Sequence, residues 1–489
     1  MKPVRAIIQQ QLQRYMPFIE HTIIHRHGLL GEKLGKRVYG RLFANQDQNV
    51  IAHELCRHLN WSRQEIEAYQ TQRLRTLITH AYYQVPFYRQ FYDAHQFCPE
   101  MFNSLDDISK VPVVQKSDLQ RAIREQKIIS KRHHGKPYVM CETTGSTGTP
   151  TQVYFSLEED TYKQALSLRS LMLNDITPGT KTALLWRNKP VDRMFLQSFL
   201  CGHFMRFSVA DTLHLSQAAL HHEKLNALLH QLELFSPHIL RGYSQAIYLL
   251  AKHYAKQKHR FNLKIQKIIG AAEYLPPGHW DFISDVFGAE IVHLYGGTEA
   301  SNIACSTKES KDMMLFEDAY HIDLLPLPNT QETGAVESST GRVIVSNLYC
   351  EYMPLIRYDL GDIATFGSSF LGFKTLSQVK GRSNDVITLP RARFVLADAW
   401  YHWFKMPWIN RFRVTQQDFD HLIIDIETND MISSETEAHD LLLKKMSQAL
   451  GSDIRIEIRL SKHLTQNQGS KWKHVISMVP DIEKNRSLS

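Results

Sequence analysis

A segment rich in hydroxyl groups and glycine, at residues 143–151, is the part of this sequence that most strongly suggests chemistry. It reads Thr-Thr-Gly-Ser-Thr-Gly-Thr-Pro-Thr and leads into an expected strand at residues 152–155. Glycines allow sharp turns and close approach of a ligand, while hydroxyl and backbone N–H groups donate to phosphate oxygens. The Gly-Lys-Ser/Thr ending of a Walker A loop is missing. The segment is therefore either a phosphate-binding loop of another kind or an ordinary surface turn.

Four further motifs follow in chain order and carry side chains that suit a nucleotide. Residues 295–299 (Tyr-Gly-Gly-Thr-Glu) offer an aromatic face, a hydroxyl and a carboxylate at the end of an expected strand. Residues 357–362 end in a glycine and Asp362, and Gly381 precedes Arg382. Residues 469–473 (Gly-Ser-Lys-Trp-Lys) place two lysines in a loop. Each motif alone is explained as a turn, an ion pair or a solvated basic loop, but the ordered set indicates a nucleotide site.

Alternating strands and helices, from about residue 137, supply the elements that position these motifs. Residues 244–256 have helical apolar spacing, with Ser244 as the expected N-cap. Short strands are expected at residues 265–269 and 290–294, each running into one of the glycine-containing segments. This alternation predicts an α/β architecture with a largely buried sheet. Residues 1–130 are predicted to be mostly helical.

A smaller pattern begins after Arg382. Helices are expected near residues 397–405 and 437–450, with strands near 411–415, 421–427 and 453–460. Residues 455–460 alternate as a half-buried strand does. With 489 residues, the chain is too long for one hydrophobic core. We therefore predict a large domain at residues 1–382 and a small α+β domain at residues 383–489.

Composition excludes several classes of protein. No apolar run is long enough to cross a bilayer, and the N-terminus lacks the apolar core of a signal peptide. The six cysteines are too scattered for a disulfide framework, which favours a cytoplasmic location. Basic patches of the nucleic-acid type and paired zinc ligands are not evident. Residues 1–41 carry eight Lys and Arg against two Glu, so a solvated basic helix or weak contact with anionic lipid is expected there.

The ordered motifs resemble those of the adenylate-forming superfamily, and specifically its phenylacetate–CoA ligase branch, which includes members associated with capsule and exopolysaccharide loci. Further similarity lies in residues 80–89, 111–119, 237–251 and 270–273. The resemblance implies a large multi-layer α/β domain followed by a small, mobile α+β lid. It also implies ATP and Mg²⁺ as cofactors, and a homodimer by analogy.

The resemblance assigns a role to each motif. The hydroxyl loop would hold the β- and γ-phosphates, Tyr295 would lie against adenine, and Thr298 would contact the α-phosphate. Glu299 would hold Mg²⁺, which prefers carboxylate and phosphate oxygens. Asp362 would accept hydrogen bonds from both ribose hydroxyls, with Arg382 beside it. The nucleotide-binding set is Thr144, Gly145, Ser146, Thr147, Gly148, Thr149, Ala272, Glu273, Tyr295, Gly296, Asp362 and Arg382.

The lysine-containing loop near the C-terminus would complete the catalytic set of Thr298, Glu299 and Lys471. Lys471 would reach from the lid to the substrate carboxylate and the α-phosphate, where negative charge develops. Lys473 is its competitor for this role, and the hinge falls on Asn384 or its neighbour. The phosphate loop ends in Pro150-Thr151-Gln152 without the lysine that many superfamily members have, although the phenylacetate branch commonly lacks it too.

The resulting hypothesis is a ligase with two half-reactions. A carboxylic acid attacks Mg-ATP to give acyl-AMP and pyrophosphate; a thiol (coenzyme A or a carrier protein) or an amine such as an amino sugar then displaces AMP. Two alternatives stay open: a nucleotidyltransferase acting on a hydroxyl group, and a non-catalytic scaffold in polysaccharide assembly. The acid is not defined by the sequence, and candidate pocket residues are Trp186, Phe207, Tyr243, Ala271 and His293.

Overall fold

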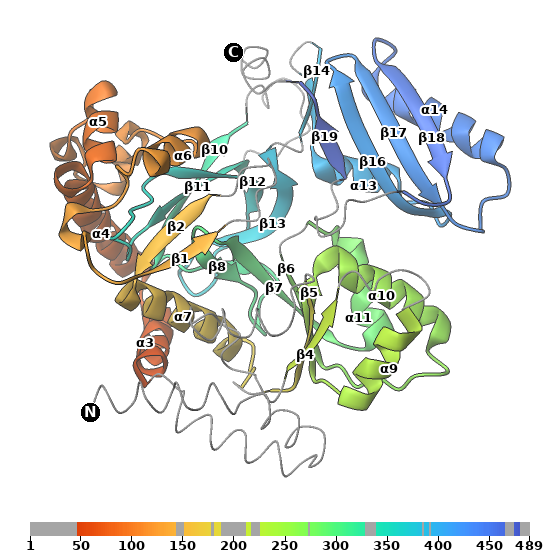
Figure 1. Ribbon diagram of the computed structural model, residues 1–489, viewed down its shortest axis with the longest axis horizontal. Coiled ribbons are helices and arrows are strands. Elements are labelled where there is room, and N and C mark those ends of the chain that lie inside the picture. Colours follow the sequence, from red (N-terminus) through yellow and green to blue (C-terminus); the bar gives the residue numbers. More distant parts are fainter. Residues whose placement is uncertain are drawn as a thin grey trace. The chain divides into compact units, whose positions relative to one another are not determined.

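The computed structural model describes residues 46–142, 151–177, 180–186, 212–216, 225–271, 274–327, 339–383, 386–390, 393–464 and 474–479 (Figure 1). The chain divides into two compact units. The first contains Met1–Asn60, Gly135–Ala272 and Trp280–Glu309, and the second contains Trp61–His134, Glu273–His279 and Ser310–Ser489. Both units are therefore assembled from segments that are distant in sequence.

The first unit is built on a mostly parallel sheet. Its strand order is β4-β3-β5-β6-β7-β8, in which only β7 and β8 run antiparallel. The strands are β3 (Thr182–Trp186), β4 (Thr212–Ser216), β5 (Ile239–Tyr243), β6 (Lys267–Ala271), β7 (Glu290–Gly297) and β8 (Ser301–Cys305). Parallel neighbours need crossover connections, and helices lie in those that run from β4 to β7.

The helices of the first unit are α3 (Gln46–Arg57), α7 (Leu157–Met172), α9 (Leu225–Phe235), α10 (Ser244–Gln257) and α11 (Pro277–Phe287), the last of which begins in the second unit. α10 packs on β5 and β6, while α7 packs on β8 and α3 (Figure 1). A separate hairpin of β1 (Tyr138–Glu142) and β2 (Gln152–Ser156) leads into α7, where a capping box at Ser156 starts the helix. The strands and helices confirm the predicted α/β class.

The second unit combines helices with an antiparallel sheet. The helices are α4 (Arg63–Gln84), α5 (Pro86–Ala94) and α6 (Lys116–Arg124); Val85 alone separates α4 from α5, and short 3₁₀ turns lie between α5 and α6. The strand order is β10-β11-β12-β13-β9, from β9 (Met313–Leu315), β10 (Tyr320–Pro326), β11 (Thr340–Asn347), β12 (Tyr358–Phe366) and β13 (Thr375–Arg382). Gln70 of α4 donates to the carbonyls of Glu317 and Tyr320, so the helical part is anchored at the start of β10.

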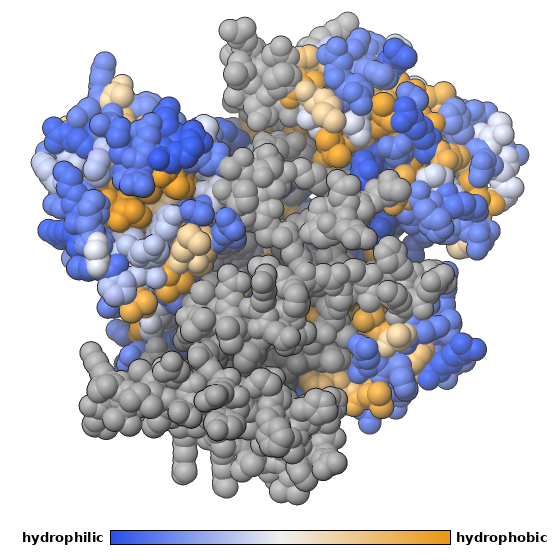
Figure 2. All heavy atoms as spheres, viewed as in Figure 1, coloured by the Kyte–Doolittle hydropathy of each residue, from blue (hydrophilic) through white to orange (hydrophobic). Residues whose placement is uncertain are grey.

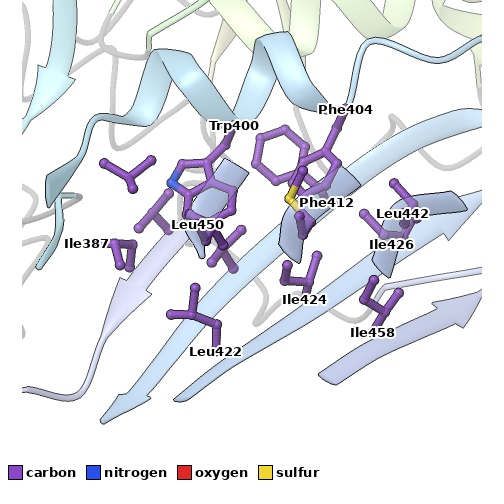
Figure 3. Close-up of a cluster of buried hydrophobic side chains, with 14 of the residues drawn as sticks. Ile387, Trp400, Phe404, Phe412, Leu422, Ile424, Ile426, Leu442, Leu450 and Ile458 are labelled. Carbon is purple, nitrogen blue, oxygen red and sulfur yellow. The ribbon is translucent and has the colours of Figure 1, made fainter. Parts of the chain in front are cut away.

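The C-terminal part of the second unit has a sheet and a hydrophobic core of its own. A hairpin of β14 (Ile387–Leu389) and β15 (Arg393–Val395) precedes a sheet of order β18-β17-β16-β19. The sheet strands are β16 (Ile409–Asp418), β17 (His421–Thr428), β18 (Arg455–Ser461) and β19 (Val475–Ser477), with helices α13 (Ala397–Trp403) and α14 (Glu435–Leu450). Figure 3 shows Trp400, Phe404, Phe412 and Leu442 among the buried side chains between helices and sheet. The separate core agrees with an α+β module, while the boundary at residue 383 stays a prediction.

Two details differ from the sequence expectation. Ser244 is not the N-cap of α10: Tyr243 occupies that position and makes no side-chain cap. The reason is that β5 ends at Tyr243 and runs directly into the helix, so Ser244 is already helical and buried. The β14–β15 hairpin was also not expected, because three-residue strands leave too short a pattern to recognise.

On the face in Figure 2, the described helices α4–α6 are mostly hydrophilic, with apolar residues in small groups. Across the described residues, no helix combines the length and apolarity that crossing a membrane requires.

Candidate active site

The Tyr-Gly-Gly-Thr-Glu motif lies where β7 turns back into β8. Gly297 ends β7 and Ser301 begins β8, so Thr298 and Glu299 lie in a three-residue turn. The turn follows the carboxyl end of a parallel strand, which is where ligands bind in open α/β sheets. It brings a hydroxyl donor and a carboxylate together, both partly exposed. Tyr295, three residues earlier, is 8% exposed and sits at the strand end as predicted.

Gly296 makes this tight turn sterically possible. A Cβ atom at Gly296 would lie 1.7 Å from the carbonyl oxygen of Ser301, a backbone atom of the facing strand. At Gly297 a Cβ would lie 3.2 Å from Oε2 of Glu299, so the carboxylate folds back over the strand end. The backbone of Ser301 is left-handed, with φ of +53°. This conformation is uncommon for a residue other than glycine, so the tight turn imposes some strain on the backbone.

Hydrogen bonds between α7 and β8 support the same turn. The sequence analysis did not predict them. Asn302, which pairs with Gly296 across the two strands, donates to Ser170 at 3.2 Å and to Ser167 at 3.5 Å. Asn174 at the end of α7 donates to the carbonyl of Ser306 at 2.8 Å. The available signal was the Ser-x-x-Ser spacing on α7, which places two hydroxyls on one helix face.

The structure brings Asp362 and Arg382 together, as a shared ribose role requires. They are direct partners across β12 and β13, and Nε of Arg382 lies 3.0 Å from Oδ1 of Asp362. The Asp362 side chain is 15% exposed and that of Arg382 is 50% exposed. A carboxylate at this position can still accept from a ligand, because it has two oxygens with about four acceptor sites.

Arg357 fixes β12 just ahead of that pair. Its guanidinium donates to the carbonyls of Ile108 and Val111 at 2.6 and 2.8 Å. The backbone N–H of Val114 donates to the carbonyl of Arg357 at 2.9 Å. Burial lowers the pKa of Arg357, an effect that the nearby carboxylate of Asp323 opposes. The contacts hold the start of β12 against the helical part of the same unit.

His474 fixes the chain directly after the lysine-containing loop. Its ring lies 4.8 Å from that of Tyr401 and 4.7 Å from that of Phe412, measured between centroids. Its carbonyl accepts from Val414 N–H at 2.7 Å. Burial lowers the pKa of His474 to about 3, so the ring is neutral at ordinary pH. Tyr401 also contacts Tyr274, which follows the predicted adenine-binding segment.

Several predicted site residues lie outside the described residues. They are Thr144, Gly145, Ser146, Thr147, Gly148, Thr149, Ala272, Glu273, Asn384, Lys471 and Lys473. The register of the β1–β2 hairpin, which pairs Glu142 with Gln152, does define where the hydroxyl loop leaves and re-enters the sheet. The roles assigned to the site residues outside the described ranges stay predictions.

A metal ion at this site would rely on Glu299. Among the described residues, no three or more His, Cys, Asp or Glu side chains are grouped to hold a metal. Mg²⁺ does not need such a cage, because it is often bound through one or two carboxylates together with substrate phosphates. The partly exposed carboxylate of Glu299, beside the Thr298 hydroxyl, fits that mode.

Comparison with known proteins agrees with this fold. Over 343 residues the chain is 24% identical to phenylacetate-coenzyme A ligase of Aromatoleum evansii, covering 67% of this chain and 73% of the relative. Over 493 residues it is 19% identical to Protein CapK of Staphylococcus aureus, covering 93% and 99%. A solved structure of 2-hydroxyisobutyryl-CoA ligase in the postadenylation state aligns with a TM-score of 0.66 at 17% identity, covering 86% of this chain and 92% of that one.

The solved structure supports the fold, and the sequence match supports the family. Residues 67–332 match the family model described as AMP-binding enzyme. That segment exceeds half of the chain and includes the β7–β8 turn with Thr298 and Glu299. The chain therefore belongs to the AMP-binding enzyme family of adenylate-forming ligases.

Proposed function

We propose that this enzyme activates a carboxylic acid with ATP and passes the acyl group to a thiol or an amine. In the first half-reaction a carboxylate oxygen attacks the α-phosphorus of ATP, and the bond to pyrophosphate breaks. In the second, the acceptor attacks the acyl carbon and AMP leaves. The observation that carries the proposal is the β7–β8 turn, which presents a hydroxyl and a carboxylate at the carboxyl end of a parallel strand.

The described residues would act mainly by binding and orienting ATP. Thr298 would donate to the α-phosphate, and Tyr295 would pack against adenine. Asp362 would accept from the ribose hydroxyls, with Arg382 holding its carboxylate in place at 3.0 Å. Bound next to Glu299, Mg²⁺ would offset the negative charge of the phosphates. Preorganised groups of this kind lower the barrier because they need no rearrangement as charge develops.

Lys471 would supply the positive charge that the first half-reaction needs, with Lys473 as its rival. We propose that the C-terminal part, residues 383–489, rotates near residues 382–386 between the two half-reactions, which is a common gating motion. His474 and β19 would give the lysine-bearing segment a rigid base, because the His474 ring is enclosed by Tyr401 and Phe412. The protein would form a homodimer, by analogy with phenylacetate–CoA ligases.

The acid and the acceptor are proposed as classes. The similarity to phenylacetate-coenzyme A ligases makes aryl acids and coenzyme A the first pair to test. The match to Protein CapK along nearly the whole chain, together with the resemblance to capsule-associated proteins, is the reason to include amino sugars as acceptors. Adenylylation of a hydroxyl group is the second candidate, because the same ATP site would serve it.

ATP–pyrophosphate exchange tests the proposal. The protein is assayed with Mg²⁺ and a panel of aryl, fatty, hydroxy and amino acids. We expect exchange that depends on one acid class and falls by about 10²–10³ in Lys471→Ala, the usual cost of removing one preorganised donor. Transfer from preformed acyl-AMP should survive in that variant, and Lys473→Ala is the matched control.

The alternatives give different products. A stable AMP adduct that resists hydroxylamine would identify hydroxyl adenylylation. Measurable ATP binding with no exchange for any acid, with or without candidate acceptors, would contradict acid activation and support a non-catalytic role.

A further inference from the structure

The peptide group between Leu360 and Gly361 is held from both sides, directly before Asp362. Its N–H, on Gly361, donates to Oδ1 of Asp359 at 2.8 Å. Its carbonyl, on Leu360, accepts from Nη1 of Arg382 at 3.0 Å. The same arginine pairs through Nε with Asp362. Asp359 and Arg382 therefore fix the backbone directly before Asp362, and Arg382 also holds the Asp362 carboxylate.

The segment needs this support because it leaves the regular ladder of the sheet. Ile344 of β11 pairs with Asp359, whereas Arg342 pairs with Ile363, so Val343 alone faces residues 360–362. Bulges of this kind redirect a side chain but leave backbone groups without ladder partners. Gly361 adopts a φ of +71°, a left-handed conformation that glycine tolerates best. Asp359 and Arg382 replace the hydrogen bonds that the ladder no longer supplies.

The Asp359 carboxylate is itself fixed by a charge on the neighbouring strand. Nη1 of Arg342 lies 2.8 Å from its Oδ2, and the Asp359 side chain is only 6% exposed. Burial of a carboxylate is tolerated when its oxygens are paired and hydrogen-bonded. Oδ2 faces Arg342 and Oδ1 faces the Gly361 N–H, so both oxygens have a defined partner.

We propose that Asp359 is the positioning residue that sets Asp362 for recognition of the ribose 2′- and 3′-hydroxyls. Asp359 does not touch the nucleotide; it acts through the Leu360–Gly361 peptide, which precedes Asp362. The inference rests on the proposed function, in which Asp362 accepts from the ribose. It explains why an aspartate directly precedes the bulge that contains Gly361.

The test compares the binding of Mg-ATP, Mg-2′-deoxyATP and Mg-3′-deoxyATP by titration calorimetry, which needs no knowledge of the acid. In the wild type, each missing hydroxyl should weaken binding. In Asp359→Ala, ATP affinity should fall about tenfold, and the affinities for the two deoxynucleotides, each of which keeps one hydroxyl, should fall by less, so discrimination is lost. Asp359→Asn keeps an oxygen for the Gly361 N–H and should restore most of the discrimination.

The matched control is Thr365→Val, farther along the same strand. It removes the buried hydrogen bond between the hydroxyls of Thr340 and Thr365, 2.7 Å long, and leaves the bulge intact. A purely structural role for Asp359 would make Asp359→Ala behave like this control, with a lower melting temperature and unchanged discrimination. That result would overturn the inference.

Failure of the underlying function would look different. Asp362→Ala should abolish the discrimination outright. If Asp362→Ala discriminates as well as the wild type does, Asp362 is not the ribose ligand and the proposed site assignment fails. If Asp362→Ala loses discrimination and Asp359→Ala keeps it, only the positioning role of Asp359 is contradicted.

Discussion

At the scale of single residues, the site depends on a few positions that tolerate one residue type. Gly296 is one, because the carbonyl of Ser301 occupies the space of its missing Cβ. Asp362 and Arg382 form another, because each is the direct strand partner of the other.

The first residue-scale prediction concerns Gly296→Ala. The new methyl group would lie 1.7 Å from a backbone oxygen, so the turn must open and Thr298 and Glu299 must move. We expect acid-dependent ATP–pyrophosphate exchange to fall by about 10² or more, with overpacking costing about 1–3 kcal/mol of stability. Gly297→Ala is the control, because its nearest contact is the movable carboxylate of Glu299 at 3.2 Å. Equal activity of the two variants would refute the steric account.

The second residue-scale prediction concerns His474 and acid. An unfolded histidine has a pKa near 6.5, whereas burial lowers the pKa of folded His474 to about 3. Between these values only the unfolded state binds the proton, so the stability that the neutral ring contributes is complete above pH 6.5 and is lost as pH falls toward 3. His474→Phe keeps an aromatic ring without this titration.

Urea unfolding at pH 7 and pH 5 measures the effect. The wild type should lose about 1–2 kcal/mol more than His474→Phe between these two pH values. Comparing the two proteins cancels the contribution of the other histidines, including His80, whose pKa burial also lowers. Equal losses in both proteins would mean that the folded His474 ring is protonated normally.

At the scale of helices and strands, the sequence predicted the elements with strong periodicity and missed contacts between distant ones. The expected helix at 437–450 and strand at 421–427 correspond to α14 (Glu435–Leu450) and β17 (His421–Thr428). Their apolar spacing is local information. Pairing between separate segments determines three other features: the bulge in β12, the Asp359–Arg342 pair and the hydrogen bonds between α7 and β8. A local pattern such as the Ser-x-x-Ser spacing on α7 does not say which distant segment it will contact, and these contacts were accordingly missed.

A prediction at this scale tests the core of the C-terminal part. Leu442 on α14 is fully buried in the cluster of Figure 3, whereas its neighbour Leu441 is 52% exposed. Leu442→Ala should destabilise the protein by about 2–5 kcal/mol through lost burial and a residual cavity. Leu441→Ala should change the free energy of unfolding by about 0.5 kcal/mol or less. Urea unfolding of both variants checks this, and similar values would show that α14 presents a different face to the sheet.

At the scale of the whole molecule, the family assignment rests on a sequence match over more than half of the chain. The AMP-binding match covers residues 67–332, while Asp362 and Arg382 come later, in β12 and β13. The sequence resemblance anticipated the family and the α/β class, because glycine-containing motifs in a fixed order are informative even at low identity. The acid and the acceptor could not be anticipated, since a binding pocket gathers side chains from distant segments.

The most direct test of acid activation follows one oxygen atom. The acid identified by the exchange assay is labelled with ¹⁸O in both carboxylate oxygens, and the reaction is run to completion with Mg-ATP and the acceptor. If the carboxylate attacks the α-phosphorus, AMP should retain one labelled oxygen after the acyl group leaves, as mass spectrometry of AMP would show. Unlabelled AMP, or label in inorganic phosphate together with ADP, would contradict the acyl-adenylate mechanism.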